Sequence, residues 1–208
     1  MCFRDKSFLR YKLGRFFEMV DVDKDGKFDR KDFTDWVNKS MENMAALGNE
    51  VTVERRKDIE RLSTPVYNLF TFYGLMGKNK KRWVGFVSVA TQMPGFKMIA
   101  KLSIKKLLKL FDFDDSGDWS LDEYVQILLL PIGISEEDTN ESSKLLDTDG
   151  KGVLDIDEVV EGLARYLSDL EENKWSHMFG HIDYDPDTWK EWRRLEASVS
   201  LITNDHTH

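Results

Sequence analysis

The chain has 208 residues, of which 41% are hydrophobic and 33% are charged, and its formal net charge is −8. This acidic balance argues against a nucleic-acid partner, which requires a basic face, and is compatible with the binding of cations. The single cysteine, Cys2, excludes an internal disulfide and indicates a reducing, cytoplasmic compartment. Because no apolar run resembles a signal peptide or is long enough to span a bilayer, we expect no membrane contact.

The first predicted unit is a helix, a twelve-residue loop and a second helix. The loop, residues 21–32, carries Asp at its first, third, fifth, ninth and twelfth positions, with Gly26 at the sixth and Phe28 at the eighth. Apolar residues at helical spacing flank it: Leu13, Phe16, Phe17 and Val20 before the loop, and Phe33, Trp36 and Val37 after it. An acidic loop between two such apolar stripes predicts a helix–loop–helix unit.

A second unit is predicted around residues 74–85, although this loop contains no carboxylate. Thr64-Pro65 is a favourable start for the helix that enters it. The apolar positions are Val66, Leu69, Phe70 and Tyr73 on the incoming helix, and Phe86, Val89, Ala90 and Met93 on the outgoing helix. We expect a structural unit without metal chemistry, in which the basic run 78–82 is a solvated turn.

The register of the first loop recurs twice, at residues 112–123 and 147–158. The apolar flanks are Ile104, Leu107, Leu108 and Phe111 before the third loop, Tyr124, Ile127 and Leu128 after it, and Val159, Leu163 and Tyr166 after the fourth. The helix that enters the fourth loop is poorer, since it carries Ser142 and Ser143 where apolar residues are expected. Three acidic loops in one register are difficult to attribute to chance.

One helix–loop–helix unit cannot bury both of its apolar faces, so the units are expected to pair. The sequence predicts a compact all-α fold with an N-terminal pair in residues 1–98, a C-terminal pair in residues 99–170, and an aromatic-rich helical tail, 171–208, on the core. In the C-terminal pair, Trp119 and Leu154 occupy the eighth loop positions and are expected to pair. In the N-terminal pair the residue opposite Phe28 is expected to be Lys81, a poorer contact.

These spacings are those of the EF-hand Ca2+ loop. Ca2+ takes about 6–8 oxygen ligands, and such a loop supplies them from its first, third and fifth side chains, a carbonyl at the seventh position, the ninth position and a carboxylate at the twelfth. Glycine at the sixth position permits the sharp bend. The acids are thereby accounted for as ligands, and no Ser–His–Asp or Cys–His arrangement is suggested, so we do not expect an enzyme.

Each acidic loop departs from the strict pattern at one position. The first ends in Asp32, whose short side chain reaches a metal less easily with both oxygens and should let Mg2+ compete with Ca2+. The third has Ser116 at its fifth position, a tolerable oxygen donor, and keeps Glu123; we expect it to be the most Ca2+-selective site. The fourth has Lys151 at its fifth position, where an ammonium replaces an oxygen, so we expect weakened binding.

The chain resembles the invertebrate sarcoplasmic calcium-binding proteins over about residues 7–170. The resemblance rests on the order of acidic and silent loops, on the long connection after Trp36-Val37 and on the Asp32-Phe33 end of the first loop. It implies a compact helical cytoplasmic protein that buffers Ca2+ and Mg2+. It also implies the metal ligands, which are Asp21, Asp23, Asp25, Lys27 (by its carbonyl) and Asp32; Asp112, Asp114, Ser116, Asp118 (by its carbonyl) and Glu123; and Asp147, Asp149, Val153 (by its carbonyl) and Glu158. Lys151 does not match that pattern.

Two alternatives to a Ca2+ buffer remain open. A Ca2+ sensor would expose an apolar groove to a partner protein, and Met41, Met44, Met93 and Met98 could line such a groove, although core packing explains them more simply. The coelenterate photoproteins and luciferin-binding proteins share the loop order and carry an aromatic ligand in a central cavity. The tail is aromatic, with Trp175, Phe179, Tyr184, Trp189 and Trp192, but we expect these residues to pack on the core. His177 and His181 are expected to be polar surface residues.

Overall fold

The computed structural model describes residues 6–71, 79–147 and 149–187. Several residues of the sequence-based predictions lie outside these ranges. They are Cys2, Tyr73, residues 74–78 of the expected silent loop, and Trp189 and Trp192 of the tail.

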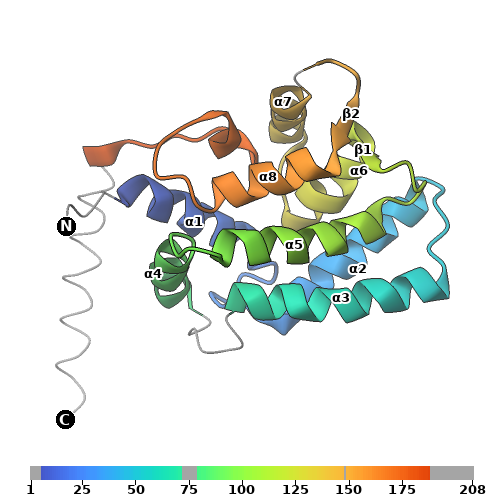
Figure 1. Ribbon diagram of the computed structural model, residues 1–208, viewed down its shortest axis with the longest axis horizontal. Coiled ribbons are helices and arrows are strands. Elements are labelled where there is room, and N and C mark those ends of the chain that lie inside the picture. Colours follow the sequence, from blue (N-terminus) through green and yellow to red (C-terminus); the bar gives the residue numbers. More distant parts are fainter. Residues whose placement is uncertain (1–5, 72–78, 148, 188–208) are drawn as a thin grey trace, which may run out of the picture.

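The described residues form the all-helical fold that the sequence predicts, apart from two three-residue strands in the loops (Figure 1). The α-helices are α1 (Ser7–Val20), α2 (Arg30–Ala46), α3 (Val53–Thr71), α4 (Lys80–Ala90), α5 (Phe96–Leu108), α6 (Leu121–Tyr124), α7 (Glu136–Leu146) and α8 (Ile156–Tyr166). The strands are β1 (Asp118–Ser120) and β2 (Val153–Asp155), and the short helical turns are η1 (Lys109–Phe111), η2 (Val125–Leu129), η3 (Leu130–Ile132) and η4 (Lys174–His177). No helix within the described ranges combines the length and apolar character that crossing a bilayer requires.

A side chain caps the helix that follows each of the four loops. Asp29 accepts a hydrogen bond from the Lys31 amide, Ser120 from the Glu123 amide and Asp155 from the Asp157 amide, and each is the ninth residue of its acidic loop. Asn79 has the same role for α4, because its Oδ1 accepts from the Arg82 amide at 3.0 Å. The first amides of a helix have no hydrogen-bond partner within the helix, and a capping side chain at the ninth loop position accepts from one of them. Asn79 is therefore the ninth residue of the silent loop.

This register moves the silent loop to residues 71–82, three residues before the range expected from the sequence. A backbone bridge between Lys27 and Asn79 supports the shift, because it joins a seventh to a ninth loop position. The C-terminal pair has the same arrangement in the Asp118–Asp155 pairing. The sequence could not set this register, because the loop has no carboxylate to mark its ends and a shift of three residues nearly preserves a helical face.

The shift changes which residues of α4 enter the core. Trp83 and Val87 are buried, and Ala90 is buried as the sequence predicts. Phe86 and Val89, which the sequence placed on the inner face, are exposed by 37% and 45%, and Met93 lies beyond α4 in the following turn and is 51% exposed. The expected contact between Phe28 and Lys81 is accordingly wrong. The ring of Phe28 packs on those of Tyr67 and Trp83, with centroids 6.0 and 6.4 Å away.

The strands β1 and β2 pair antiparallel and confirm the contact predicted for the C-terminal pair. Trp119 lies opposite Leu154, and both side chains are buried. This two-stranded ladder holds the third and fourth loops side by side (Figure 1).

The two halves of the chain share one continuous core. The Phe16 ring packs on Trp83 and Phe179, and the Trp36 ring on Phe111. The Ile127 carbonyl, in the π-helical turn η2, accepts hydrogen bonds from Trp36 Nε1 at 3.1 Å and from Ser40 Oγ at 2.9 Å. The π-helical geometry interrupts the regular pattern of helix hydrogen bonds, and side chains of α2 donate to a carbonyl of this turn.

The described part of the tail packs on the C-terminal half. Met178, Phe179 and Ile182 are buried, and the Met178 carbonyl accepts hydrogen bonds from Ser142 Oγ at 2.5 Å and from the Tyr124 hydroxyl at 3.0 Å. Ser142 therefore faces the core as a hydrogen-bond donor. Ser142 looked unfavourable in the sequence because its hydrogen-bond partner lies in the tail, 36 residues away.

Trp175 fits against a glycine of α8. A Cβ atom added to Gly162 would lie 2.6 Å from the Trp175 ring, closer than van der Waals contact allows. The glycine thus provides the space for the indole.

Lys12 is the most unusual residue of the core. Its side chain is fully buried, its Nζ has no hydrogen-bond partner among the described residues, and the Phe8 and Tyr166 rings lie 4.9 and 5.5 Å away. Burial lowers the pKa of Lys12 from 10.5 to about 8, against the attraction of Asp169 and Glu172. Because the folded pKa is the lower one, folding releases the proton, and stability should increase as the pH rises from about 8 towards 10.5.

We predict that Lys12→Met stabilises the fold by on the order of 2–3 kcal/mol at pH 7 and flattens this pH dependence. Urea unfolding at pH 7, 8, 9 and 10 measures both effects, with Lys109→Met as the exposed control. An unchanged pH profile in Lys12→Met would contradict the assignment.

Candidate metal sites

The first acidic loop brings three carboxylates together at the end of α1. One carboxylate oxygen from each of Asp21, Asp23 and Asp25 lies within 4.8 Å of the others. Asp21 directly follows α1, and its Oδ2 accepts from the Gly26 amide at 3.0 Å. Gly26 has a φ of 81°, a conformation that glycine adopts without strain.

Asp32 closes this loop from the start of α2. Its Oδ1 accepts from the Val22 amide at 2.9 Å, and its Oδ2 accepts from the Asp29 amide at 2.8 Å. The side chain is buried, and burial raises the pKa of Asp32 above its usual range. A buried carboxylate whose oxygens face the loop backbone is costly to ionise and is stabilised by a cation placed beside it.

Two exposed lysines neutralise part of this cluster. Lys31 Nζ pairs with Asp23 at 3.0 Å, and Lys27 Nζ pairs with Asp25 at 3.2 Å. The hydrogen bond from Lys31 lowers the pKa of Asp23. Exposed ion pairs contribute little to stability, so a divalent cation can replace both lysines at small cost.

The third loop brings together Asp112, Asp114 and Glu123, again with one oxygen of each within 4.8 Å of the others. Asp112 is buried after η1 and accepts from the Ser116 amide at 3.1 Å and from the Gly117 amide at 2.8 Å. Burial raises the pKa of Asp112, whereas hydrogen bonds from Ser116 lower the pKa of Asp114.

Glu123 closes the third loop as Asp32 closes the first. Its Oε1 accepts from the Phe113 amide at 3.4 Å and its Oε2 from the Ser120 amide at 2.9 Å. Within the described part of the chain, none of the three clustered carboxylates of this loop forms an ion pair. The third loop is thus the better prepared site for a cation.

The fourth loop differs because a lysine takes the place of a ligand. Lys151 Nζ lies 2.6 Å from Asp149 Oδ2, and this contact raises the pKa of Lys151 and lowers that of Asp149. Asp147 accepts from the Lys151 and Gly152 amides, so its backbone contacts are those of the other loops. No group of three carboxylates forms in the described part of this loop.

Glu158 is exposed, and no hydrogen bond from a described residue reaches it. It lines a hollow with Asp118, Asp147, Asp149 and Lys151. The fourth loop therefore keeps the backbone shape of a cation site, while Lys151 neutralises one of its carboxylates.

The remaining assignments of the sequence-based ligand set stay predictions. Ser116 Oγ donates to the Asp118 carbonyl at 2.8 Å, which places two predicted ligands of the third loop side by side. The carbonyls of Lys27 and Val153 are at the equivalent seventh positions of their loops. His177 contacts Glu172 at 3.1 Å, so it has a carboxylate partner rather than a metal cluster.

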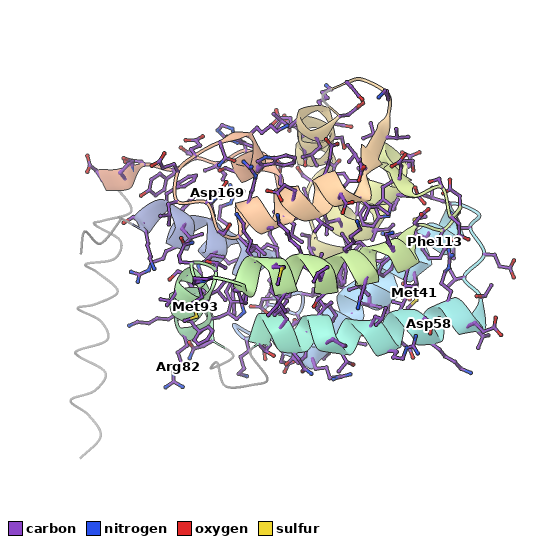
Figure 2. The ribbon with its side chains drawn as sticks, viewed as in Figure 1. Met41, Asp58, Arg82, Met93, Phe113 and Asp169 are labelled. Carbon is purple, nitrogen blue, oxygen red and sulfur yellow. The ribbon has the colours of Figure 1, made fainter. Side chains whose placement is uncertain are left out.

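Sequence reasoning missed Arg55, which links α3 to the third loop. Its guanidinium donates to the Asp112 carbonyl at 3.0 Å and to Asp115 Oδ1 at 2.7 Å, and it lies 5.2 Å from the Phe113 ring. Figure 2 labels Phe113 in the turn after α5, near the start of α3. Because Arg55 lies 57 residues before Asp112, no local pattern could have paired them.

No protein-family model and no curated protein matches the sequence. Among solved structures, the fold is similar to the coelenterazine-binding protein from Renilla muelleri in its Ca-loaded apo form, with a TM-score of 0.69 and 17% identity, covering 88% of this chain and 100% of that chain. A calcium-binding protein from Streptomyces coelicolor has a TM-score of 0.62 and 21% identity, covering 77% of this chain and 98% of that chain. The photoprotein clytin has a TM-score of 0.60 and 22% identity, covering 87% and 96%.

The chain has the four-EF-hand fold. The predicted fold class is thereby confirmed. At these identities the likeness concerns the fold alone, and the narrower resemblance to sarcoplasmic calcium-binding proteins stays a prediction.

We predict that Lys151→Asp converts the fourth EF-hand loop into a cation site. The substitution removes the ammonium and adds an oxygen at the fifth position, so the Ca2+ affinity of this loop should rise by at least tenfold. Lys151→Met is the matched control, because it removes the charge without adding a ligand. Equal Ca2+ binding of the two variants in calorimetric titrations would show that Lys151 is not what weakens the loop.

Proposed function

We propose that this chain is a cytoplasmic Ca2+ buffer whose first and third EF-hand loops bind the ion. The observation that carries the proposal is the gathering of carboxylate oxygens from Asp21, Asp23 and Asp25, and from Asp112, Asp114 and Glu123, within 4.8 Å. Such converging carboxylates repel one another, and a hard divalent cation relieves that repulsion. The fourth loop contributes weakly, because Lys151 puts an ammonium at a ligand position and pairs with Asp149.

Mg2+ competes at the first loop in this proposal. Asp32 and Glu123 close their loops with the same two backbone contacts, but Asp32 is one methylene shorter. A short carboxylate favours the smaller, six-coordinate Mg2+ over a Ca2+ ion with seven or more ligands.

A buffering role is supported by the closed packing of the helices. A sensor must open its helix pairs to expose an apolar groove. Here Trp36 and Ser40 of α2 bond to the Ile127 carbonyl, and Phe16 of α1 packs on Phe179 of the tail, so opening either half breaks contacts with the other. These cross-contacts favour a fold that fills its sites with little movement.

A calorimetric Ca2+ titration of the metal-free protein, with and without millimolar Mg2+, tests the proposal. We expect two strong sites, one of them weakened by Mg2+. Glu123→Gln should abolish the Mg2+-insensitive site, because it removes a buried charged ligand, while the matched variant Glu158→Gln should leave the number of strong sites unchanged. Absence of binding heat in the folded, metal-free protein would refute Ca2+ binding, and three strong sites would refute the impairment of the fourth loop.

Reciprocal substitutions at the twelfth position test the source of ion selectivity. We expect Asp32→Glu to raise Ca2+ affinity at the first loop and to reduce competition by Mg2+, because the longer carboxylate can bind Ca2+ with both oxygens. Glu123→Asp should make the third loop sensitive to Mg2+ for the same reason. Competition titrations measure both, and an unchanged Mg2+ sensitivity in both variants would place the selectivity elsewhere in the loops.

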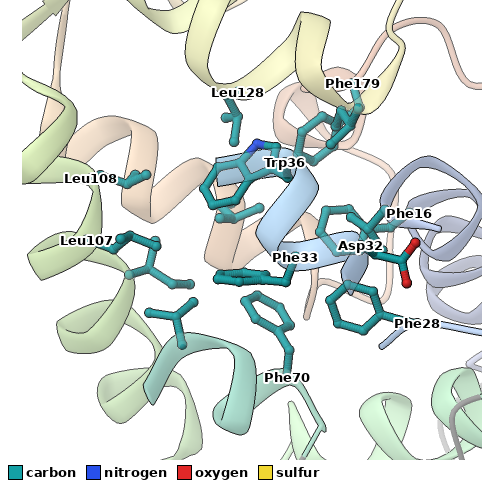
Figure 3. Close-up of a pocket in the computed structure, with 15 residues that line it drawn as sticks. Phe16, Phe28, Asp32, Phe33, Trp36, Phe70, Leu107, Leu108, Leu128 and Phe179 are labelled. Carbon is teal, nitrogen blue, oxygen red and sulfur yellow. The ribbon is translucent and has the colours of Figure 1, made fainter. Parts of the chain in front are cut away.

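Carriage of an apolar small molecule is the second candidate function. An apolar cavity of about 70 Å3 lies at the centre of the fold, among Phe16, Phe33, Trp36, Phe70 and Leu108 (Figure 3). The similar structures include a coelenterazine-binding protein and an okadaic acid binding protein. A cavity of roughly 150 Å3 is known to hold benzene, so a ligand of several rings requires this core to expand.

The position of the cavity also suggests an experiment that distinguishes the buffer from the carrier function. Asp32 lines it together with the aromatic residues, so the first metal loop and the cavity share a wall. A carrier should bind an added multi-ring aromatic compound with a change in tryptophan fluorescence, and the compound should alter Ca2+ affinity reciprocally. A pure buffer should show neither effect.

A further inference from the structure

Most of the large hydrophobic residues that are exposed in the described part of the chain lie in one stretch of the sequence. Of the ten large hydrophobic residues that are exposed in the described part of the chain, six lie between residues 86 and 102. Five of them define what we call the α4–α5 apolar face, with exposures of 45% for Val89, 51% for Met93, 63% for Met98, 53% for Ile99 and 56% for Leu102. Scattered exposed hydrophobic residues are normal, but a group on consecutive elements indicates a binding surface.

The face occupies the end of α4, the turn after it and the first half of α5. Met98 and Leu102 are four residues apart in α5, so they are separated by about one helical turn, while Val89 ends the exposed side of α4 and Met93 lies in the turn. Figure 2 labels Met93 beside α4, at the edge of the molecule. No described segment covers these side chains, as their exposure shows.

The described chain ends close to this face. The Tyr184 ring packs 5.1 Å from the Phe8 ring of α1, and the Tyr11 hydroxyl donates to the Asp183 carbonyl at 2.7 Å. The same end of α1 contacts α4, because Lys6 Nζ donates to the Ser88 carbonyl at 3.2 Å. Ser88 directly precedes Val89, so the described chain ends against α1, the helix that packs beside α4 and the start of the apolar face.

The remaining sequence has the length and pattern to cover the face. Residues 188–208 carry Trp189, Trp192, Leu195 and Val199, spaced three or four residues apart. In a helix these residues would share one side, and 21 residues would span about 30 Å. Neighbouring helices lie about 8–10 Å apart, so this length suffices to cross α4 and reach the start of α5.

We propose that residues 188–208 dock on the α4–α5 apolar face through this tryptophan-containing stripe. The α4–α5 face exposes large apolar side chains, the tail sequence carries an apolar stripe, and docking would remove both from water. Because the stripe is tethered at Asp187, its effective concentration at the face is high and no second chain is required.

Paired substitutions in the full chain test the proposal from both sides. Met98→Glu/Leu102→Glu places charges on the face and should release the tail, so tryptic cleavage after Arg193 and Arg194 should accelerate at least fivefold. The matched control is Leu47→Glu/Val53→Glu, which changes two comparably exposed apolar residues near the junction of α2 and α3. This control should leave cleavage unchanged. Equal cleavage of both variants and the unchanged protein overturns the proposal.

The reverse substitution tests whether the tail shields the face. Trp192→Glu/Leu195→Glu should raise the binding of an apolar dye at least threefold, and adding Met98→Glu/Leu102→Glu should abolish that rise, because the exposed site is then gone. Dye binding that is unaffected by the tail substitution, or that persists in the combined variant, overturns the proposal.

Two further measurements discriminate other occupants of the face. Gel filtration at increasing protein concentration detects a second copy, and sedimentation with phosphatidylcholine–phosphatidylserine vesicles detects a lipid surface. Loss of dimerisation or vesicle binding in Met98→Glu/Leu102→Glu, without a change in tail cleavage, overturns tail docking in favour of that occupant. All assays are run with Ca2+ and with chelator, so their outcome is independent of the proposed metal function.

Discussion

The carboxylate at the twelfth loop position is the interaction on which the EF-hand geometry of this chain depends. Asp32 and Glu123 each accept one hydrogen bond from the amide of the second loop residue and one from the amide of the ninth. One buried side chain thereby ties the start of the loop to the cap of the outgoing helix. It also fixes the relative direction of two helices, and with them the apolar faces that form the core. The same oxygens face the place where a cation would lie, so one carboxylate both holds the loop together and would serve as a metal ligand.

The fourth loop illustrates what remains when this closure is absent. Glu158 is exposed, yet the loop keeps its shape, because β2 pairs with β1 and Asp147 still accepts two backbone amides. Lys151 supplies internally the positive charge that a metal would otherwise provide. A loop can thus keep its shape without a closing carboxylate, and in the silent second loop, which has no carboxylate, Asn79 still caps the outgoing helix.

The two halves are joined by directional polar contacts as well as by apolar packing. The Ile127 carbonyl, in the π-helical turn η2, accepts from Trp36 and Ser40, and the Asp112 carbonyl of the third loop accepts from Arg55. Such hydrogen bonds fix the relative register of the halves, which packing alone leaves adjustable. Arg55 also brings the N-terminal half into direct contact with the loop that is best prepared for a cation. The halves are therefore a single structural unit around the central cavity.

The sequence by itself determined the helical class, the three acidic loops and the carboxylates that converge in two of them, because these features follow from spacing within twelve residues. It also indicated that Lys151 opposes binding in the fourth loop, since its charge is unfavourable wherever the loop lies. Only the tertiary structure decided the register of the silent loop, because no acid marks its ends, and the Asn79 cap together with the backbone bridge from Lys27 to Asn79 sets it. Tertiary contacts likewise explained Ser142, whose partner is a carbonyl 36 residues away, and revealed Arg55, whose partner is 57 residues away. Local spacing is encoded in neighbouring residues, whereas these pairings exist only once distant segments have packed together.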